Sequence, residues 1–210
     1  MQRVVPAILT KDQKELQMQL QALKDQSRWV HIDIMDGKFV PAVSINLAEL
    51  KEANQFFNLE IHLMVQEPEK YLEDCNAVGA KRVYFHLKGA KDPKAVLLRM
   101  EQYPFQRGIA INPEMPVEEF LPFAETAEAV LFMSIVPGAQ GNEFIPTVLS
   151  KVQDVRSRTS DILIGMDGGI EKDNIKQVFG AKVDYVAVGS GIWKTKDPIA
   201  SLKELQEMVS

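Results

Sequence analysis

The segment HIDIMDG, residues 31–37, places an imidazole and a carboxylate two positions apart in an apolar stretch. Side chains alternate between the two faces of a β-strand, so His31 and Asp33 share one face and the aliphatic residues between them line the other. Buried polar side chains are costly unless a partner satisfies them. We therefore expect this face to take part in chemistry, either as a metal site or in acid–base catalysis.

Two further apolar stretches contain the same residue types, with His62 in EIHLMV and Asp167 in LIGMDGG. If both meet His31 and Asp33, one divalent cation satisfies two imidazoles and two carboxylates together. This ligand set suits Zn, Fe, Mn or Co better than Mg or Ca. The third histidine, His86 in YFHLKG, has no acidic neighbour on its strand, and we expect it in the core or behind the ligands.

Glycines gather at the ends of three other apolar stretches, in VPGAQGNEF (136–144), DGGI (167–170) and VGSGI (188–192). Glycine lets backbone N–H groups and the start of a helix approach an anion closely. Three such loops on one face predict a phosphate site that is made by backbone dipoles rather than by basic side chains.

Methionines follow the polar residues at strand spacing. Met35 lies two positions after Asp33, Met64 lies two positions after His62, and Met133 lies in the stretch LFMSI. Methionine usually fills gaps in a core. This spacing leaves two interpretations open. The methionines fill gaps in the core, or they form an apolar floor that keeps water away from a metal ion.

The elements that must position these residues alternate along the chain. Short apolar stretches predict strands, and amphipathic segments such as KDQKELQMQLQALKDQ predict helices between them. About eight such units close into an α/β (β/α)8 TIM barrel, whose chemistry lies at the carboxyl ends of the strands. No linker divides residues 1–210, so we expect a single domain. The alternative is an open doubly wound sheet, but LTKDQKE after the first strand lacks the glycine-rich turn of that fold.

Composition narrows the class of protein. The chain has 210 residues, is 46% hydrophobic and carries a net charge of -5, from 24 basic and 29 acidic residues. These values favour a globular protein without a nucleic-acid surface. No stretch is long enough to span a membrane and MQRVVPAILTKDQ lacks the apolar core of a signal peptide, so we expect a cytoplasmic location. A single cysteine, Cys75, agrees with a reducing compartment.

The stretches HIDIMDGKFVP, IHLMVQEPEKYL, FMSIVPG and MDGGI, followed by VGSGIW, resemble in order and spacing the ribulose-phosphate 3-epimerase family. The resemblance extends over nearly the whole chain. It implies a barrel of the ribulose-phosphate-binding type, one divalent metal ion (Zn, Fe, Mn or Co), and interconversion of D-ribulose 5-phosphate and D-xylulose 5-phosphate. It also implies a small phosphosugar as the partner, a homo-oligomer and a place in the pentose phosphate pathway.

Carried over residue by residue, the resemblance makes His31, Asp33, His62 and Asp167 the metal ligands. Asp33 and Asp167 also become the catalytic pair, which removes the C3 proton and returns one through a cis-enediolate that the metal ion stabilises. The substrate and phosphate contacts that the resemblance implies are His62, Gly138, Ala139, Gln140, Gly141, Gly168, Gly169, Gly189 and Ser190.

The chain departs from the family pattern in two places. The family has a substrate-contacting serine where this chain has Ala7, and the sixth loop has Ala139 in place of an aromatic residue and Asn142 in place of glutamine. Two alternatives therefore stay open, an epimerase of a hexulose 6-phosphate of the allulose 6-phosphate type and a non-catalytic phosphosugar-binding homologue. A third is a decarboxylase or aldolase akin to hexulose-phosphate synthase, but the D-x-K-x-x-D pattern of that group lacks its lysine between Asp33 and Asp36.

Overall fold

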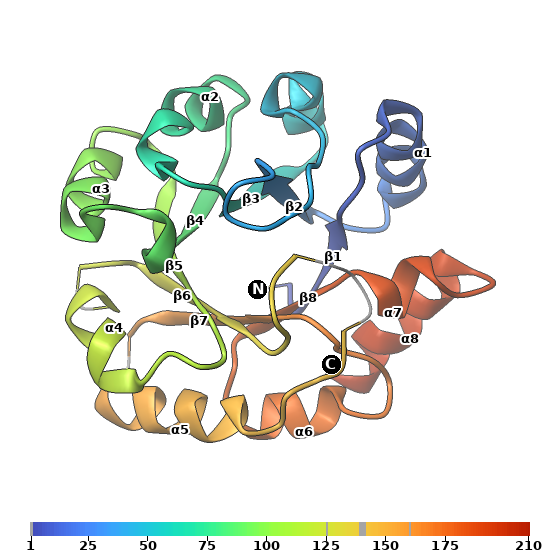
Figure 1. The fold of residues 1–210 in the computed structure, drawn as a ribbon. Helices are drawn as coiled ribbons and strands as arrows, with labels where there is room; N and C mark the ends of the chain where they lie inside the picture. Colours follow the sequence, from blue (N-terminus) through green and yellow to red (C-terminus); the bar gives the residue numbers. More distant parts are fainter. Residues whose placement is uncertain (1, 125, 139–141, 160) are drawn as a thin grey trace.

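Parallel strands close into a barrel in the computed structural model, which describes residues 2–124, 126–138, 142–159 and 161–210 (Figure 1). Within these residues eight strands follow one another around the barrel in chain order, and β8 pairs with β1 to close it. The strands are Val4–Ile8 (β1), Trp29–Met35 (β2), Asn58–Met64 (β3), Arg82–His86 (β4), Gln106–Ile111 (β5), Ala129–Met133 (β6), Leu163–Asp167 (β7) and Tyr185–Val188 (β8). The predicted (β/α)8 barrel is confirmed, and the alternative of an open sheet is wrong.

Helices surround the barrel and cover the outer faces of its strands (Figure 1). The α-helices are Gln13–Leu23 (α1), Leu72–Ala77 (α2), Pro93–Met100 (α3), Val117–Ala124 (α4), Val148–Arg158 (α5), Ile175–Gly180 (α6), Ser190–Trp193 (α7) and Pro198–Met208 (α8). Short 3-10 helices lie at Leu47–Leu50 (η1), Ala53–Gln55 (η2), Pro68–Lys70 (η3) and Leu87–Gly89 (η4).

Two of the longer helices begin at an Asp-Pro pair. The side chains of Asp92, before α3, and Asp197, before α8, each accept a hydrogen bond from the backbone N–H three residues further on. Such a cap stabilises a helix by about 1 kcal/mol, and the fixed φ of proline suits the first helical position. Local sequence therefore determines where these two helices start.

Each strand has one face toward the helices and one toward the barrel axis. On β2, Val30, Ile32 and Ile34 belong to the main hydrophobic core, whereas His31 and Asp33 lie in the polar cluster of the interior. This arrangement follows from the alternation of side chains along a strand.

Two tyrosines fill part of the barrel interior. Tyr84 and Tyr185 are fully buried and their hydroxyl oxygens lie 2.8 Å apart. Glycines on the neighbouring strands make room for the rings, because a Cβ on Gly108 would lie 2.2 Å from the Tyr84 ring and a Cβ on Gly165 would lie 2.5 Å from the Tyr185 ring. Barrel interiors of this class are usually layers of branched apolar side chains, so an aromatic and polar filling is a distinctive feature of this chain.

Asp36, directly after β2, joins two loops at the carboxyl end of the barrel. Its Oδ1 accepts hydrogen bonds from the N–H groups of Lys38 and Phe39, and its Oδ2 accepts one from the N–H of Gln66, each at 2.9 Å. Against the effect of burial, these bonds hold the pKa of Asp36 below its ordinary value. The loops after β2 and β3 are therefore fixed beside each other.

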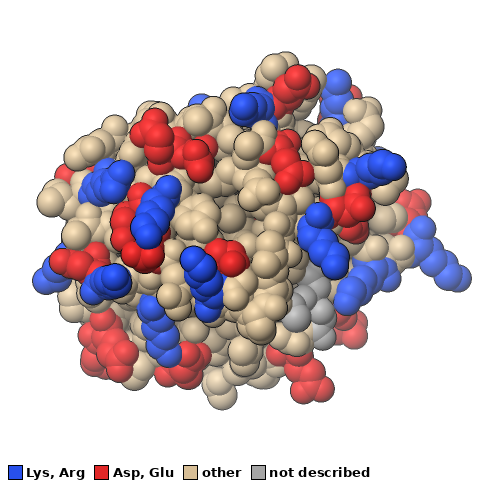
Figure 2. All heavy atoms as spheres, turned by 45° about the horizontal axis from the view of Figure 1, so that its top comes forward, with Lys and Arg blue, Asp and Glu red and all other residues tan. Residues whose placement is uncertain are grey.

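Charged side chains of both signs are interspersed over the face shown in Figure 2, and neither sign forms a continuous patch there. Surface ion pairs in the described part of the chain include Lys70 with Glu67 at 2.6 Å and Lys88 with Glu114 at 2.5 Å. Among the described residues, no helix has both the length and the apolar character that crossing a membrane requires.

Candidate metal centre and active site

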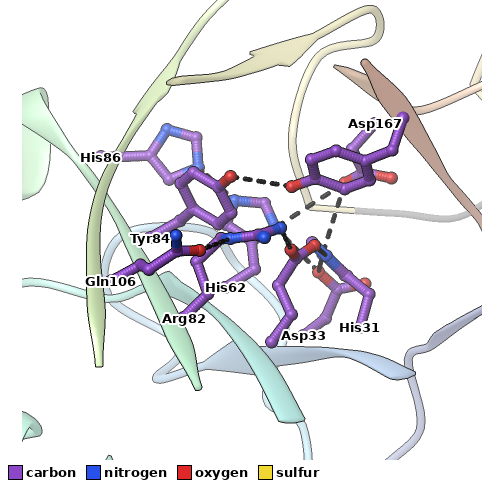
Figure 3. Close-up of polar contacts among 10 residues, drawn as sticks. His31, Asp33, His62, Arg82, Tyr84, His86, Gln106 and Asp167 are labelled. Atoms are coloured by element: carbon purple, nitrogen blue, oxygen red, sulfur yellow. Dashed lines mark hydrogen bonds and ion pairs between the residues drawn. The ribbon is translucent and has the colours of Figure 1, made fainter. Parts of the chain in front are cut away.

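Two imidazoles and two carboxylates meet inside the barrel (Figure 3). His31 and Asp33 come from β2, His62 from β3 and Asp167 from the end of β7. All four are buried, and their potential ligand atoms all lie within 4.8 Å of one another. Barrel closure produces this meeting, because β2 and β7 are not neighbours in the sheet. The four residues selected from the sequence thus form a cluster that can hold a metal ion.

His31 anchors one ring nitrogen and presents the other to the cluster. Its Nδ1 lies 2.6 Å from Oε1 of Glu60 on β3, so Nδ1–H donates to that carboxylate. Its Nε2 lies 3.4 Å from Oδ1 of Asp33 and 4.0 Å from Oδ2 of Asp167. This Nε2 is buried and has no hydrogen-bond partner among the described residues. An unpartnered nitrogen between two carboxylates is suited to bind a cation.

His62 has one ring nitrogen in the cluster and one against another histidine. Its Nδ1 lies 2.9 Å from Oδ1 of Asp33 and 3.7 Å from Oδ2 of Asp167. Its Nε2 lies 2.9 Å from Nε2 of His86, and Nδ1 of His86 lies 2.6 Å from Oδ1 of Asn112. His86 therefore lies behind the candidate ligand His62. This is one of the two positions that we expected for it from the sequence.

The buried charges of the described residues fit a divalent cation. The buried carboxylates are those of Asp33, Glu60 and Asp167, and the buried permanent cation is the guanidinium of Arg82. Oε2 of Glu60 lies 2.5 Å from Nη1 of Arg82, so these two charges neutralise each other. When both imidazoles bind an ion through unprotonated nitrogens, the carboxylates of Asp33 and Asp167 supply two negative charges that balance one divalent ion. The nitrogen and oxygen donors present also fit Zn, Fe, Mn or Co.

Burial and neighbouring charges separate the two carboxylates of the cluster. Burial and the Asp33 carboxylate raise the pKa of Asp167 to about 6. Burial also acts to raise the pKa of Asp33, but the adjacent imidazoles of His31 and His62 outweigh it and hold that pKa well below its ordinary value. Two carboxyl groups whose environments push their pKa values apart are suited to act as base and acid.

The histidines are shifted in opposite directions. Burial acts to lower the pKa of His31, but the carboxylates of Asp33 and Glu60 outweigh it and raise that pKa well above its ordinary value. Burial and the adjacent His62 imidazole lower the pKa of His86 well below its ordinary value, so His86 is neutral near pH 7. Burial also acts to raise the pKa of Glu60, but His31 and Arg82 hold it below its ordinary value.

A cavity that is open to solvent lies at this end of the barrel and is lined by Asp33 and Asp167. Its other lining residues include all the methionines of the predicted apolar floor and five of the predicted substrate contacts, namely Met35, Met64, Met133, Gly138, Gly168, Gly169, Gly189 and Ser190. His62, also predicted to contact substrate, is fully buried and is not part of the lining. The predicted contacts Ala139, Gln140 and Gly141 lie outside the described residues.

Glycine is required where β7 runs into the cavity wall. Gly168 and Gly169 have φ values of 109° and 62°, a region that side chains other than glycine rarely adopt. A Cβ on Gly168 would lie 2.4 Å from the Ile135 side chain. The carbonyl of Gly168 accepts a hydrogen bond of 2.6 Å from Oγ of Ser134, which holds the turn against β6.

Ala7 presents a methyl group to the same cavity, at the position where the resemblance to the family implies a serine. Its carbonyl accepts a hydrogen bond of 2.7 Å from the indole Nε1–H of Trp193 on α7. This bond joins β1 to the short helix α7, which begins within the VGSGI stretch. The backbone at Ala7 is therefore fixed, although no hydroxyl reaches the cavity from this position.

Three residues of the site were not identified from the sequence. Glu60 lies two positions before His62 on one strand, the same spacing that identified His31 and Asp33, so alternation along the strand is the pattern that would have placed it in the interior. Asn112 follows β5 and Ser134 follows β6. Both are polar residues at the end of an apolar stretch, and this is the sequence pattern from which they could have been predicted.

Fold and site together define a (β/α)8-barrel protein with a candidate cation centre at the carboxyl ends of its strands. The chain belongs to the ribulose-phosphate 3 epimerase family, whose model matches residues 3–193. This confirms the resemblance seen in the sequence and places the chain in a family of epimerase enzymes.

Curated relatives cover nearly the whole chain. A protein of Mycobacterium bovis named ribulose-phosphate 3-epimerase is 33% identical over 209 residues, which cover 97% of this chain and 91% of that protein. One of Schizosaccharomyces pombe with the same name is 29% identical over 213 residues, 99% of this chain and 93% of the relative. The cytoplasmic isoform of rice, also named ribulose-phosphate 3-epimerase, is 29% identical and covers 99% of this chain and 94% of its own.

Solved structures of other proteins share the fold. A 3-hexulose-6-phosphate synthase has a TM-score of 0.76 at 13% identity, with 99% of this chain and 100% of that chain covered. Orotidine 5'-phosphate decarboxylase from Pyrococcus horikoshii has a TM-score of 0.72 at 14% identity, with 98% of each chain covered. At these identities the likeness shows the barrel alone.

Proposed function

We propose that this chain inverts the configuration at C3 of a ketose phosphate, and that it interconverts D-ribulose 5-phosphate and D-xylulose 5-phosphate. The observation that carries this proposal is the meeting of Asp33 and Asp167, from strands that are not neighbours, at one cavity beside two imidazoles. Membership of the family and the names of the curated relatives support it.

Inversion at C3 needs a proton to leave one face of the carbon and a proton to arrive at the other. Asp33 and Asp167 serve as the two acid/base groups, because they reach the cavity from β2 and β7. Asp33 accepts the proton from one face and Asp167 supplies one to the other. In the ion-free protein their surroundings push the two pKa values apart, as in other acid/base pairs. In the reverse reaction the two groups exchange roles.

His31, Asp33, His62 and Asp167 would hold one divalent cation, which supplies Lewis-acid stabilisation of the negative charge that develops on the substrate oxygens. Glu60 and His86 orient the two imidazoles from behind. Met35, Met64 and Met133 line the cavity beside these ligands and exclude water from the reacting carbon.

The glycine-lined wall of the cavity binds the phosphate. Gly168, Gly169 and Gly189 follow β7 and β8, the strands after which this barrel class binds phosphate groups. Backbone N–H groups of such turns attract an anion without a basic side chain. Phosphate binding far from C3 fixes the sugar and thereby the face of the carbon that each carboxylate meets.

A hexulose 6-phosphate of the allulose 6-phosphate type is the second candidate substrate. Ala7 favours it, because a methyl group occupies the cavity wall where the family pattern has a serine, and the altered hydrogen bonding changes which hydroxyls the site satisfies. Direct comparison of kcat/KM for the two ketose phosphates distinguishes these substrates.

The deciding experiment measures epimerisation and exchange together. Wild-type protein is incubated with D-ribulose 5-phosphate in D2O, with and without a chelator, and deuterium at C3 and xylulose 5-phosphate are followed by NMR. We expect both to form, and the chelator to abolish both. Asp33→Asn and Asp167→Asn should each abolish exchange while the circular dichroism spectrum is unchanged.

Asp154→Asn is the matched control, since Asp154 pairs with Arg158 on α5 and does not line the cavity. It should epimerise at the wild-type rate. Substantial exchange in both Asp33→Asn and Asp167→Asn would refute the assigned roles. Binding of the phosphosugar without any exchange in the wild-type protein would indicate a non-catalytic homologue.

A further inference from the structure

A chain of hydrogen bonds runs from the surface of the barrel to the ligand His62. Nδ2 of Asn112 donates to Oε1 of Glu114 at 3.3 Å, and the same Glu114 oxygen lies 2.5 Å from Nζ of Lys88. The amide NH2 of Asn112 is thereby turned toward the surface. Its carbonyl oxygen Oδ1 faces inward and lies 2.6 Å from Nδ1 of His86.

This amide orientation determines the tautomer of His86. An amide oxygen only accepts hydrogen bonds, so Nδ1 of His86 carries the proton and donates to Asn112. In a neutral imidazole the other nitrogen is then an acceptor. His86 is held in this position by burial and by the ring of Phe39, whose centroid lies 4.8 Å from its own.

The tautomer of His86 determines that of His62 in turn. The two Nε2 atoms lie 2.9 Å apart, and because Nε2 of His86 accepts, Nε2 of His62 must donate. When His62 carries a single proton, that proton therefore lies on Nε2, and Nδ1 keeps its lone pair. This Nδ1 faces Oδ1 of Asp33 at 2.9 Å, where two acceptors stand together. A cation shared by both atoms satisfies this arrangement.

We propose that Asn112 is a positioning residue for the metal centre, acting through His86 to keep Nδ1 of His62 free of a proton and available to the ion. This inference rests on the proposed function, because it assumes that the cluster holds a divalent cation. Asn112 itself lies two residues away along the relay and is not one of the four candidate ligands.

Replacement of Asn112 tests the direction of the relay, and Asn112→Leu does so without changing the charge. In Asn112→Leu, His86 has no acceptor at Nδ1, and it can turn its proton to Nε2, which forces the proton of His62 onto Nδ1. Loss of a group that orients a metal-ligating histidine typically weakens metal binding about 10- to 100-fold. Asn112→Asp restores an acceptor at the same place and should bind the ion at least as tightly as the wild-type protein.

The probe is Co²⁺, added to chelator-treated protein and followed by its visible spectrum in competition with a chelator of known affinity. We expect Asn112→Leu to bind Co²⁺ about 10- to 100-fold more weakly than wild type, with Asn112→Asp near wild type. In a His86→Phe background, Asn112→Leu should have no further effect, since the relay is already broken. Wild-type Co²⁺ affinity in Asn112→Leu, or equal further losses in both backgrounds, would overturn the proposal.

A second measurement does not depend on the folding of any variant. In ¹⁵N-labelled wild-type protein loaded with Zn²⁺, imidazole NMR should find the protons on Nε2 of His62 and on Nδ1 of His86. A proton on Nε2 of His86 overturns the proposal. If the wild-type protein binds Co²⁺ and epimerises, but the variant affinities or the proton positions differ from those expected, only the relay is wrong. A wild-type protein that binds no ion refutes both the relay and the proposed metal centre.

Discussion

Nδ1 of His31 and Oε1 of Glu60 lie 2.6 Å apart inside the barrel, and both side chains are fully buried. The contact leaves Nε2 of His31 as the nitrogen available to a cation. The other carboxylate oxygen of Glu60 is held by Arg82 at 2.5 Å. A fixed acceptor behind a metal-ligating imidazole sets its tautomer and increases its basicity.

Glu60→Gln should therefore weaken divalent-cation binding about 10- to 100-fold, because the amide lacks the negative charge that holds and polarises His31. Chelator competition with Zn²⁺ measures the change. The control is Glu128→Gln, which removes a charge that pairs with Arg107 outside the cluster and should leave Zn²⁺ affinity unchanged. Equal affinities for Glu60→Gln and wild type would contradict this role of Glu60.

Arg82→Met should strongly destabilise the protein. It leaves the fully buried Glu60 carboxylate without its cation, and breaking one side of a buried ion pair costs about 3–5 kcal/mol. Chemical denaturation measures the free energy of unfolding. The double variant Glu60→Leu with Arg82→Met should recover much of the loss, because no unpaired charge remains. A double variant as unstable as the sum of the two single ones would show that the ion pair is not the cause.

Gly168→Ala should impair both folding stability and substrate binding. An alanine there is strained at a φ of 109°, and its Cβ would lie 2.4 Å from Ile135 in the cavity wall. We expect a loss of about 1–3 kcal/mol in stability, together with a higher KM for the phosphosugar. Gly180→Ala is the matched control, since nothing lies within 4 Å of its Cβ position. If the two variants behave alike, the geometry of the turn at Gly168 is not what matters.

The stability of the ion-free protein should fall as the pH rises from about 4 to about 7. Asp167 has its pKa raised from 3.8 to about 6, so the folded state binds the proton more tightly than the unfolded state does. The contribution of this group is fully present below pH 3.8 and is lost as the pH rises through about 6, at most roughly 3 kcal/mol in total.

Thermal and denaturant unfolding in a chelator, compared with Asp167→Asn, isolates this contribution because the amide does not titrate. The unfolding free energy of the wild-type protein, taken relative to that of Asp167→Asn, should decrease as the pH rises across this range. Excess Zn²⁺ should remove the decline in the wild-type protein, since a cation replaces the proton. Parallel pH profiles for the two chelated proteins would contradict the raised pKa.

The sequence alone was sufficient to predict the barrel and the four members of the cluster. Repetition of apolar and amphipathic segments is a local pattern, and it predicts alternating strands and helices before any contact is known. Alternation along β2 likewise predicts that His31 and Asp33 share a face. These properties depend on neighbouring residues in the chain, which is why they were predictable without the structure.

The tertiary structure decided which groups stand behind the ligands. Glu60 and Arg82 are paired in the register of β3 and β4, and His62 meets His86 across the same two strands. Such contacts depend on strand order, register and closure of the barrel, which no local pattern determines. The sequence therefore determined the elements and the face of each polar residue, whereas the closed sheet determined which buried charges neutralise each other and which nitrogen of each imidazole faces the ion.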